Sequence, residues 1–152
     1  WKALLDDRID VIATDHAPHT LEEKINSYTT CPSGGPLVQY ALVAMFEAHH
    51  QGKISVEKIV EKMCHNPAKI FKIEKRGFIK EGYYADIAIV NAYLPWNVKK
   101  ENILYKCGWS PFEGYNFKSR VTHTFVNGKL VYHNGKVKDV KVGQRLLFER
   151  EV

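Results

Sequence analysis

The chain has 152 residues, of which 45% are hydrophobic and 26% are charged, a composition typical of a folded globular protein rather than a disordered segment. Its 22 Lys and Arg residues outnumber 17 Asp and Glu residues, but the basic residues are scattered and never form a run longer than a pair. This pattern indicates a solvated surface and argues against a partner nucleic acid. No apolar run approaches the ~20 residues that a membrane span requires, so we expect no membrane segment.

The start of the chain and its cysteines give two further expectations. Residues 1–5 have no initiator Met and no signal-peptide layout, so we expect them to be the tail of a helix within a longer protein. Cys31, Cys64 and Cys107 are widely spaced and odd in number, and they form no Cys-x-x-Cys pair. This spacing argues against a zinc ribbon or a disulfide framework and favours a reducing, cytoplasmic location.

Residues 9–19 concentrate the polar groups that could carry chemistry. The mostly apolar residues 9–13 predict a strand buried on both faces of a parallel sheet. Asp15 follows it directly, and His19 comes four residues later, beyond a proline. Ligands gather at the carboxyl ends of such strands, so Asp15 is a candidate metal ligand and proton acceptor, with His19 facing the same site. Spacing alone leaves open a plain alternative, a helix cap followed by a solvated histidine.

A polar, aperiodic stretch at residues 21–30 predicts a loop. It leads into Cys31-Pro32-Ser33-Gly34-Gly35-Pro36, where two glycines between prolines let backbone amide groups approach a ligand closely. A turn that simply precedes a helix would explain the same residues.

The next predicted elements are helices. Residues 37–50 are apolar almost all round, as expected for a helix buried on several sides, and Gly52 ends it. Ser55 caps a second helix, whose apolar residues keep the spacing i, i+3, i+4, i+7 and i+8. The apolar positions of this helix are Val56, Ile59, Val60, Met63 and Cys64, so Cys64 is interpreted as a core residue.

A third, short helix is predicted through Phe71, with Asn66 as its cap and Pro67 as its first residue. His65, at the junction with the preceding helix, is interpreted as structural.

From Gly77 onward the hydrophobic period changes from helical to two, which predicts strands. The expected strands are residues 85–90, 121–125, 129–132 and 136–137. Asn127-Gly128 and Asn134-Gly135 are strong signals for tight turns between them. The aromatic loop at residues 107–114 is expected to pack across several elements.

Taken together, these motifs resemble those of dihydroorotases, zinc enzymes of the amidohydrolase superfamily. The residues that carry the resemblance follow in the family's order: Ala13-Thr14-Asp15-His16-Ala17-Pro18-His19, then Cys31 to Gly35, His65 to Phe71, and Gly77-Phe78-Ile79 through Gly82 to Ala85-Asp86-Ile87. The resemblance covers about residues 10–137. It implies an α/β fold in which residues 1–76 form the C-terminal part of a (β/α)8 TIM-type barrel and residues 77–152 form part of a small β-sandwich.

The resemblance also implies an activity, the interconversion of dihydroorotate and N-carbamoyl aspartate in pyrimidine biosynthesis. Two zinc ions would activate water for attack on the ring carbonyl. Asp15 would ligate zinc and shuttle a proton, while His19 and the backbone of Ser33 and Gly34 would bind the substrate. The family's other metal ligands are a His-x-His pair, a carboxylated Lys and two further His. They match no motif here, so the resemblance implies an N-terminal barrel portion as the partner of this chain.

Several alternatives stay open at this point. Leu37 and Gln39 stand where family members often carry a Gly and a Glu, which leaves the local loop geometry undecided. An allantoinase or a dihydropyrimidinase would share the architecture, although the Asp-His-Ala-Pro-His and Pro-Ser-Gly-Gly segments favour a dihydroorotase. A metal-less, dihydroorotase-like structural partner of another pyrimidine enzyme is the second alternative. The oligomeric state is also open, a homodimer included.

Overall fold

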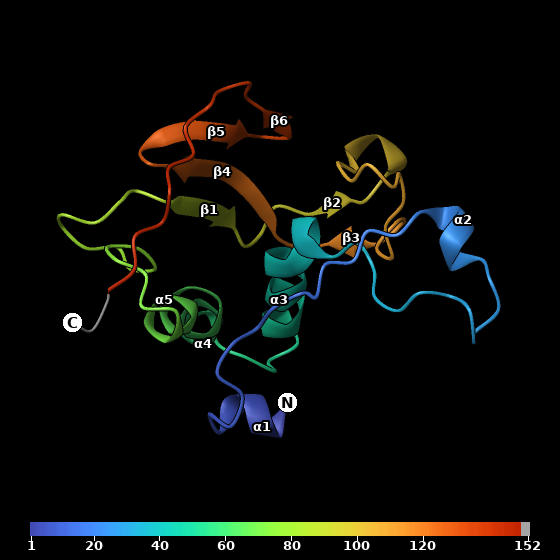
Figure 1. The fold of residues 1–152 in the computed structure, drawn as a ribbon, viewed down its shortest axis with the longest axis horizontal. Helices are drawn as coiled ribbons and strands as arrows, with labels where there is room; N and C mark the ends of the chain where they lie inside the picture. The colour runs from blue at the N-terminus through green and yellow to red at the C-terminus, as the bar shows by residue number, and fades with distance from the viewer. Residues whose placement is uncertain (150–152) are drawn as a thin grey trace.

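The computed structural model describes residues 1–149, in which an extended N-terminal segment runs beside a helical region and an antiparallel sheet (Figure 1). The helices are α1 (Lys2–Leu5), α2 (Leu21–Lys24), η1 (Val38–Tyr40), α3 (Ala41–His50), α4 (Val56–Val60), η2 (Glu61–His65), α5 (Asn66–Ile70) and η3 (Lys100–Asn102). The strands are β1 (Ile87–Asn91), β2 (Trp96–Asn97), β3 (Asn116–Phe117), β4 (Arg120–Val126), β5 (Lys129–His133) and β6 (Lys136–Val137). None of the helices in this described range is long and apolar enough to cross a membrane.

The helical region follows most of the predicted pattern. Together, η1 and α3 form the apolar helix expected at residues 37–50, and Gly52 follows its end with φ +70°. The Ser55 hydroxyl accepts a hydrogen bond from the Lys58 backbone amide at 3.2 Å, which confirms the predicted helix cap. One hydrophobic core lies between α1, α3 and α4 and consists of Leu4, Ala48, Ile54 and Ile59.

Two predictions in this region are wrong. After α4 the backbone adopts π-helical hydrogen bonding in η2, which shifts the residues that follow out of the α-helical period. Cys64 is therefore exposed instead of lying in the core, and Lys62 takes a buried position. Asn66 lies inside α5 rather than capping it, and its side-chain amide donates instead to the Asp10 carbonyl at 2.8 Å. The predicted structural role of His65 agrees with its stacking on Phe78, at 4.3 Å between ring centroids.

The predicted strand at residues 9–13 is absent from the described structure. A parallel strand needs neighbours to satisfy its backbone groups, and other partners take that place here. The Lys62 ammonium donates to the Ile9 carbonyl at 2.6 Å, and the Ile12 amide donates to the Lys62 carbonyl at 3.1 Å. The stretch is therefore tied to η2 and α5 rather than paired within a sheet. The predicted loop at residues 21–30 also differs from the structure, because it contains the short helix α2.

The β-rich half agrees closely with the sequence pattern. Strands are ordered β1-β4-β5-β6 in an antiparallel sheet, and β2 pairs with β3 beside it. Both predicted turns are present: Asn127 and Gly128 have φ values of +49° and +76°, and Asn134 and Gly135 have values of +45° and +89°. Two successive residues with positive φ are the geometry of a type I′ hairpin, for which Asn-Gly is favoured.

A second hydrophobic core joins the sheet to the helices. It is formed by the buried side chains of Tyr40, Val43, Val98 and Phe117, with Trp96 and Phe112 packed against them. The aromatic loop contributes Phe112 to this core, and its Trp109 indole donates to the His19 carbonyl at 2.9 Å. The prediction that this loop packs across elements is therefore confirmed.

Candidate functional site

Asp15 lies where the extended N-terminal segment turns into the loop before α2. Its φ of +46° is in the left-handed region, which is uncommon for a residue other than glycine. The residue is exposed, and among residues 1–149 its carboxylate has no hydrogen-bond or ion-pair partner. An uncommitted carboxylate on a sharply turned backbone is available to a ligand or to a proton.

His16 joins the two predicted site segments, a role that sequence reasoning missed. Its Nδ1 accepts backbone hydrogen bonds from Leu37 at 3.1 Å and from Val38 at 3.4 Å, so the remaining ring nitrogen, Nε2, carries the proton of the neutral imidazole. His16 also forms an isolated parallel β-bridge with Gly35, and the Ala17 amide donates to the Gly35 carbonyl at 3.0 Å. The only sequence signal for this role was the position of His16 next to Asp15.

Gly34 is required by the close approach of these segments. Its φ is +82°, and a Cβ atom at this position would lie 2.7 Å from the Ala17 Cβ. The glycine therefore permits the segment around Gly34 to contact the segment around Ala17, and it leaves the backbone amides accessible to a ligand. Ser33 and Gly34 are exposed, and within the described residues their amide groups have no hydrogen-bond acceptor. Both amides are free to donate to a bound molecule.

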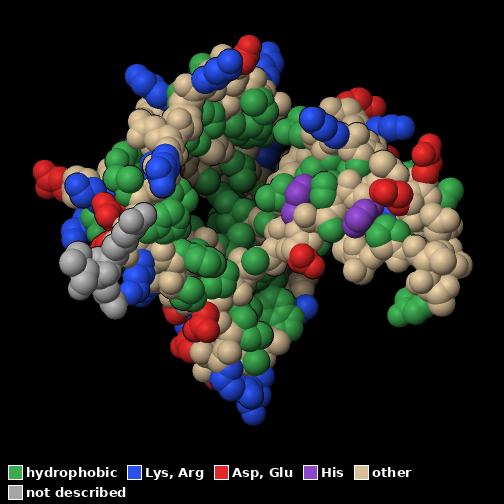
Figure 2. All heavy atoms as spheres, in the orientation of Figure 1, with side chains coloured by type: hydrophobic (Ala, Val, Ile, Leu, Met, Phe, Trp, Pro, Cys, Tyr) green, Lys and Arg blue, Asp and Glu red, His purple; other side chains and the backbone are tan. Residues whose placement is uncertain are grey.

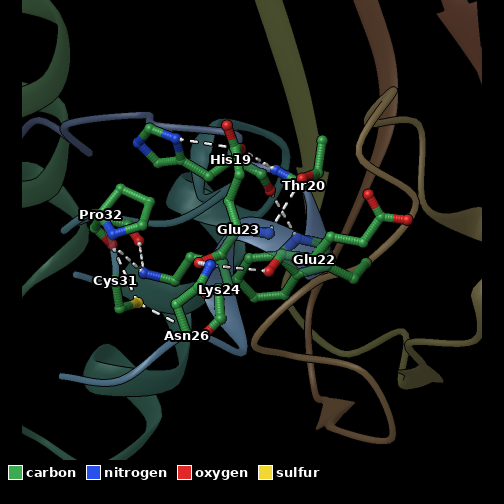
Figure 3. Close-up of polar contacts among 10 residues, drawn as sticks. His19, Thr20, Glu22, Glu23, Lys24, Asn26, Cys31 and Pro32 are labelled. Atoms are coloured by element: carbon green, nitrogen blue, oxygen red, sulfur yellow. Dashed lines mark hydrogen bonds and ion pairs between the residues drawn. The ribbon is translucent and has the colours of Figure 1, made fainter.

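His19 is held by contacts on both sides of its backbone and by its ring. Its amide donates to the Ala17 carbonyl at 2.9 Å, and its own carbonyl accepts the Trp109 indole hydrogen bond. The ring Nδ1 lies 3.5 Å from Glu23 Oε2 (Figure 3), and the side chain is only partly exposed. These contacts leave Nε2 as the ring atom that can reach a ligand.

Helix α2 begins with a capping box that fixes Glu23 next to His19. The Thr20 amide donates to the Glu23 carboxylate at 2.8 Å, and the Glu23 amide donates to the Thr20 hydroxyl at 3.3 Å (Figure 3). The hydrogen bond from the Thr20 amide is the largest cause that lowers the pKa of the Glu23 carboxyl below its usual value. Glu23 is therefore anionic at neutral pH.

Gln39 stands where family members often carry a Glu, and it connects η1 to residues 102–105, which precede the aromatic loop. Its side-chain amide donates to the Asn102 carbonyl at 2.7 Å, while its side-chain oxygen accepts from the Leu104 amide at 2.9 Å. The Gln39 backbone amide also donates to the Tyr105 hydroxyl at 2.8 Å. Because an amide side chain both donates and accepts, it suits this pair of contacts, whereas an ionised Glu could only accept.

The described residues do not provide a complete metal site. No group of three or more His, Cys, Asp and Glu side chains within residues 1–149 is arranged to hold a metal ion. A firmly held zinc ion needs three or four protein ligands. The exposed carboxylate of Asp15 fits one such position, while Nδ1 of both neighbouring histidines is directed to protein groups.

The amidohydrolase family model matches residues 1–131 of the chain. Among curated relatives, the dihydroorotase of Pyrococcus furiosus is 37% identical over 147 residues, which are 97% of this chain and 34% of that protein. The dihydroorotase of Endomicrobium trichonymphae is 41% identical over 134 residues, which are 86% of this chain and 31% of that protein. The chain thus spans about a third of the length of these relatives.

Solved structures give the same family. The L-hydantoinase (dihydropyrimidinase) of Arthrobacter aurescens has a TM-score of 0.82 at 27% identity, over 91% of this chain and 32% of that chain. The D-hydantoinase (dihydropyrimidinase) of a Thermus species has a TM-score of 0.83 at 23% identity, over 91% of this chain and 31% of that chain. These neighbours are TIM-barrel proteins, so the likeness confirms the predicted fold class, although residues 9–13 form no strand in the described structure. The chain belongs to the amidohydrolase family.

Proposed function

We propose that the protein containing this chain is a dihydroorotase, which interconverts dihydroorotate and N-carbamoyl aspartate in pyrimidine biosynthesis. The observation that carries the proposal is the contact between two segments distant in sequence. Through the His16–Gly35 bridge, the segment that carries the uncommitted carboxylate of Asp15 lies beside the segment that carries the free amides of Ser33 and Gly34. The 36–41% identity to proteins named dihydroorotase supports the same activity.

Each of these groups has a defined task in ring opening. Water adds to the ring carbonyl, and the bond between that carbon and the ring nitrogen then breaks. The Asp15 carboxylate accepts a proton from the attacking water and delivers it to the departing nitrogen, as general base and then general acid. His19 and the Ser33 and Gly34 amides hold the substrate, with His19 donating to the exocyclic carboxylate through Nε2.

Zinc is the proposed cofactor, with two ions in the complete protein. When bound, it supplies a Lewis acid and a nucleophile that is available near neutral pH. Asp15 would contribute one ligand, and the remaining ligands would come from the part of the protein beyond this chain. The free cysteines Cys31, Cys64 and Cys107 support the proposed cytoplasmic location, since disulfides are rare in that compartment.

The solved neighbours are named hydantoinase and dihydropyrimidinase, so a related cyclic amidohydrolase is the first alternative function. Their 23–27% identity is lower than the 36–41% identity of the dihydroorotases, which favours the first proposal. The second alternative, a metal-less structural partner, would not explain why Asp15 is exposed without a protein contact.

A substrate panel on the complete protein tests the proposal. We expect turnover of dihydroorotate at least about a hundredfold above that of dihydrouracil, hydantoin and allantoin, with zinc present in the purified protein. Metal content is measured by atomic emission and ring opening by ultraviolet absorbance. A preference for a substrate without the exocyclic carboxylate would replace the proposal with the hydantoinase alternative. Absence of metal together with absence of turnover would favour the structural partner.

A further inference from the structure

Helix α2 contacts both segments that the proposed function assigns to substrate binding. Glu23 lies beside the His19 ring, while the next residue, Lys24, reaches in the direction of residues 31–34 (Figure 3). The Lys24 ammonium donates to the Pro32 carbonyl at 2.5 Å and to the Gly34 carbonyl at 3.0 Å. Lys24 is thus the side chain that holds the two carbonyls on either side of Ser33.

These two hydrogen bonds determine the direction of neighbouring amides. A trans peptide unit is planar, and its N–H points opposite to its C=O. With the Pro32 carbonyl directed to Lys24, the Ser33 N–H points away from Lys24, where no described protein group accepts it. With the Gly34 carbonyl directed to Lys24, the Gly35 N–H points to the opposite side, where Gly35 forms its bridge with His16. One ammonium therefore orients the peptide unit before Ser33 and the peptide unit after Gly34.

Lys24 is itself held in place, so its position does not depend on a mobile helix end. Its carbonyl accepts a hydrogen bond from the Cys31 thiol at 3.4 Å. The Asn26 side-chain amide donates to the Glu22 carbonyl at 3.2 Å and to the Glu23 carbonyl at 3.0 Å, which satisfies the last turn of α2 (Figure 3). The Lys24 side chain is only partly exposed, and its charge-assisted bonds are therefore incompletely screened by solvent.

We propose that Lys24 is a positioning residue of the substrate site, which presets the Ser33 amide to donate to the substrate by holding the Pro32 and Gly34 carbonyls. The inference rests on the proposed function for the identity of the substrate. The contacts of Lys24 themselves do not depend on the proposed function. Without the ammonium, the Pro32 carbonyl keeps only the weaker hydrogen bond from the Cys31 thiol at 3.5 Å, so the peptide unit between Pro32 and Ser33 is held less firmly and substrate binding must order it again.

The experiment compares three variants of the complete, metal-loaded protein. Lys24→Met removes the ammonium and keeps an unbranched side chain, and Lys24→Arg restores a cation with several donors. Lys129→Met removes a charge that makes no hydrogen bond or ion pair within the described residues. Two quantities are measured: kcat and KM for dihydroorotate, and amide hydrogen exchange of residues 33–35 without substrate. Prolines at both ends of this segment carry no amide hydrogen, so an exchange peptide that spans it reports Ser33, Gly34 and Gly35.

For Lys24→Met we expect KM to rise at least about tenfold, since a hydrogen bond to a charged group contributes about that factor or more, while kcat changes less than about threefold. Amide exchange at Gly35 should become at least about tenfold faster, because its peptide unit is no longer held. Lys24→Arg should lie within about fivefold of the parent protein, and Lys129→Met should match it in both measurements.

Unchanged exchange and unchanged KM in Lys24→Met, with normal zinc content, would overturn the inference. A fall in kcat alone would also overturn it, because a group that presets binding acts on KM. If Lys24→Met does not fold, Lys24→Gln replaces it with the same criteria. If the parent protein does not turn over dihydroorotate, the proposed function fails, and the exchange measurement still decides whether Lys24 orders this segment.

Discussion

Asp15 combines a strained backbone with an unused side chain. An L-residue in the left-handed region costs about 1–2 kcal/mol relative to its ordinary conformation, and Asp is one of the few that visits this region. The structure therefore places a carboxylate at a position where glycine would be easier to accommodate. Such a combination is typical of functional sites, where strain is maintained by the surrounding contacts.

Asp15→Asn should separate the chemical role of this residue from its structural role. Asn also tolerates positive φ, so we expect the complete protein to keep its fold. Hydrolysis of dihydroorotate should fall by about three orders of magnitude or more, because an amide cannot accept the proton of the attacking water. Turnover, zinc content and circular dichroism are measured together. Near-normal turnover with normal metal content would remove Asp15 from the mechanism.

His19→Ala should reveal what the imidazole recognises. A charge-assisted hydrogen bond to a carboxylate contributes about 1.5–3 kcal/mol, so dihydroorotate should bind about 10- to 150-fold more weakly. An analogue that lacks the exocyclic carboxylate should lose much less affinity. Isothermal titration of both ligands against parent and variant makes the comparison. Equal losses for the two ligands would show that His19 does not contact the carboxylate.

Asp7 ties the N-terminal segment to the helices through two lysines. Its Oδ1 lies 2.8 Å from Lys58 Nζ and 2.9 Å from Lys62 Nζ, and the Lys62 side chain is only 1% exposed. The hydrogen bond from Lys58, followed by that from Lys62, lowers the pKa of the Asp7 carboxyl to about 2. A lowered pKa in the folded state means that this pairing stabilises the fold above about pH 4 and loses that effect as the pH falls towards 2.

The corresponding prediction is a change in acid sensitivity. Asp7→Asn should lower the Tm at pH 7, because the buried ammonium of Lys62 loses its counter-ion. Between pH 4 and pH 2 the Tm of the variant should fall less steeply than that of the parent protein. Thermal unfolding followed by circular dichroism from pH 2 to pH 7 tests both statements. Parallel Tm profiles over the acid range would contradict the assigned cause.

At the scale of elements, Gly77 shows how closely the helical region and the β-rich half approach each other. Its φ is +78°, and a Cβ here would lie 2.5 Å from the Ala68 Cβ and 2.7 Å from the Cys64 carbonyl oxygen. Both neighbours belong to helical elements, so neither can move without displacing a helix. The chain can pass this point only with glycine.

Gly82 provides a matched control for that statement. Its φ of +79° is nearly the same, but no atom lies within 4 Å of the position of its Cβ. Gly82→Ala should therefore cost only the left-handed strain of about 1–2 kcal/mol. Gly77→Ala should cost about 1–3 kcal/mol more, from overpacking against α5 and η2. Chemical denaturation of both variants measures the difference, and equal losses would mean that the helices yield to the added methyl group.

Individual elements differ in how well the sequence alone predicts them. The two Asn-Gly turns are determined by local backbone preferences, and the structure places both as predicted. An unbroken α-helical period predicts Cys64 in the core, but the π-helical turn η2 interrupts that period. The strand at residues 9–13 depends on partners that the described residues do not provide, and Lys62 and Asn66 bind its backbone instead. The two-residue turn signals are therefore reliable, whereas the assumed helical period and the non-local strand pairing are not.

The same distinction applies to the candidate site. Asp15, His19, Ser33 and Gly34 could be selected from the sequence because the resemblance supplied their roles. The structure adds the contacts between them, such as the His16 bridge and the Lys24 anchor, which pair residues too far apart for any local pattern to reveal. The assigned roles themselves, and the domain division after residue 76, stay predictions.

At the scale of the whole molecule, hydrophobic side chains surround a hollow on the face that is drawn in Figure 2. A cavity of about 430 Å³ opens between α3 and the sheet, with Val43, Val121 and Val131 among its lining residues. Ile25 and Ile79 are 76% and 91% exposed. Exposed apolar area of this kind usually marks a surface that contacts another part of the protein or another chain, and a homodimer stays one prediction for it.

The last prediction concerns residues 1–152 expressed alone. We expect this polypeptide to bind zinc weakly and to have no measurable dihydroorotate hydrolysis, because the described residues supply at most one uncommitted ligand where zinc needs three or four. Its apolar face should also bind a hydrophobic dye or promote self-association. Zinc titration, turnover and sedimentation are measured for the polypeptide alone and for the complete protein. Tight zinc binding and turnover by the isolated polypeptide would refute both the proposed ligand set and the barrel assignment. A partial barrel with one uncommitted carboxylate cannot supply a complete zinc site.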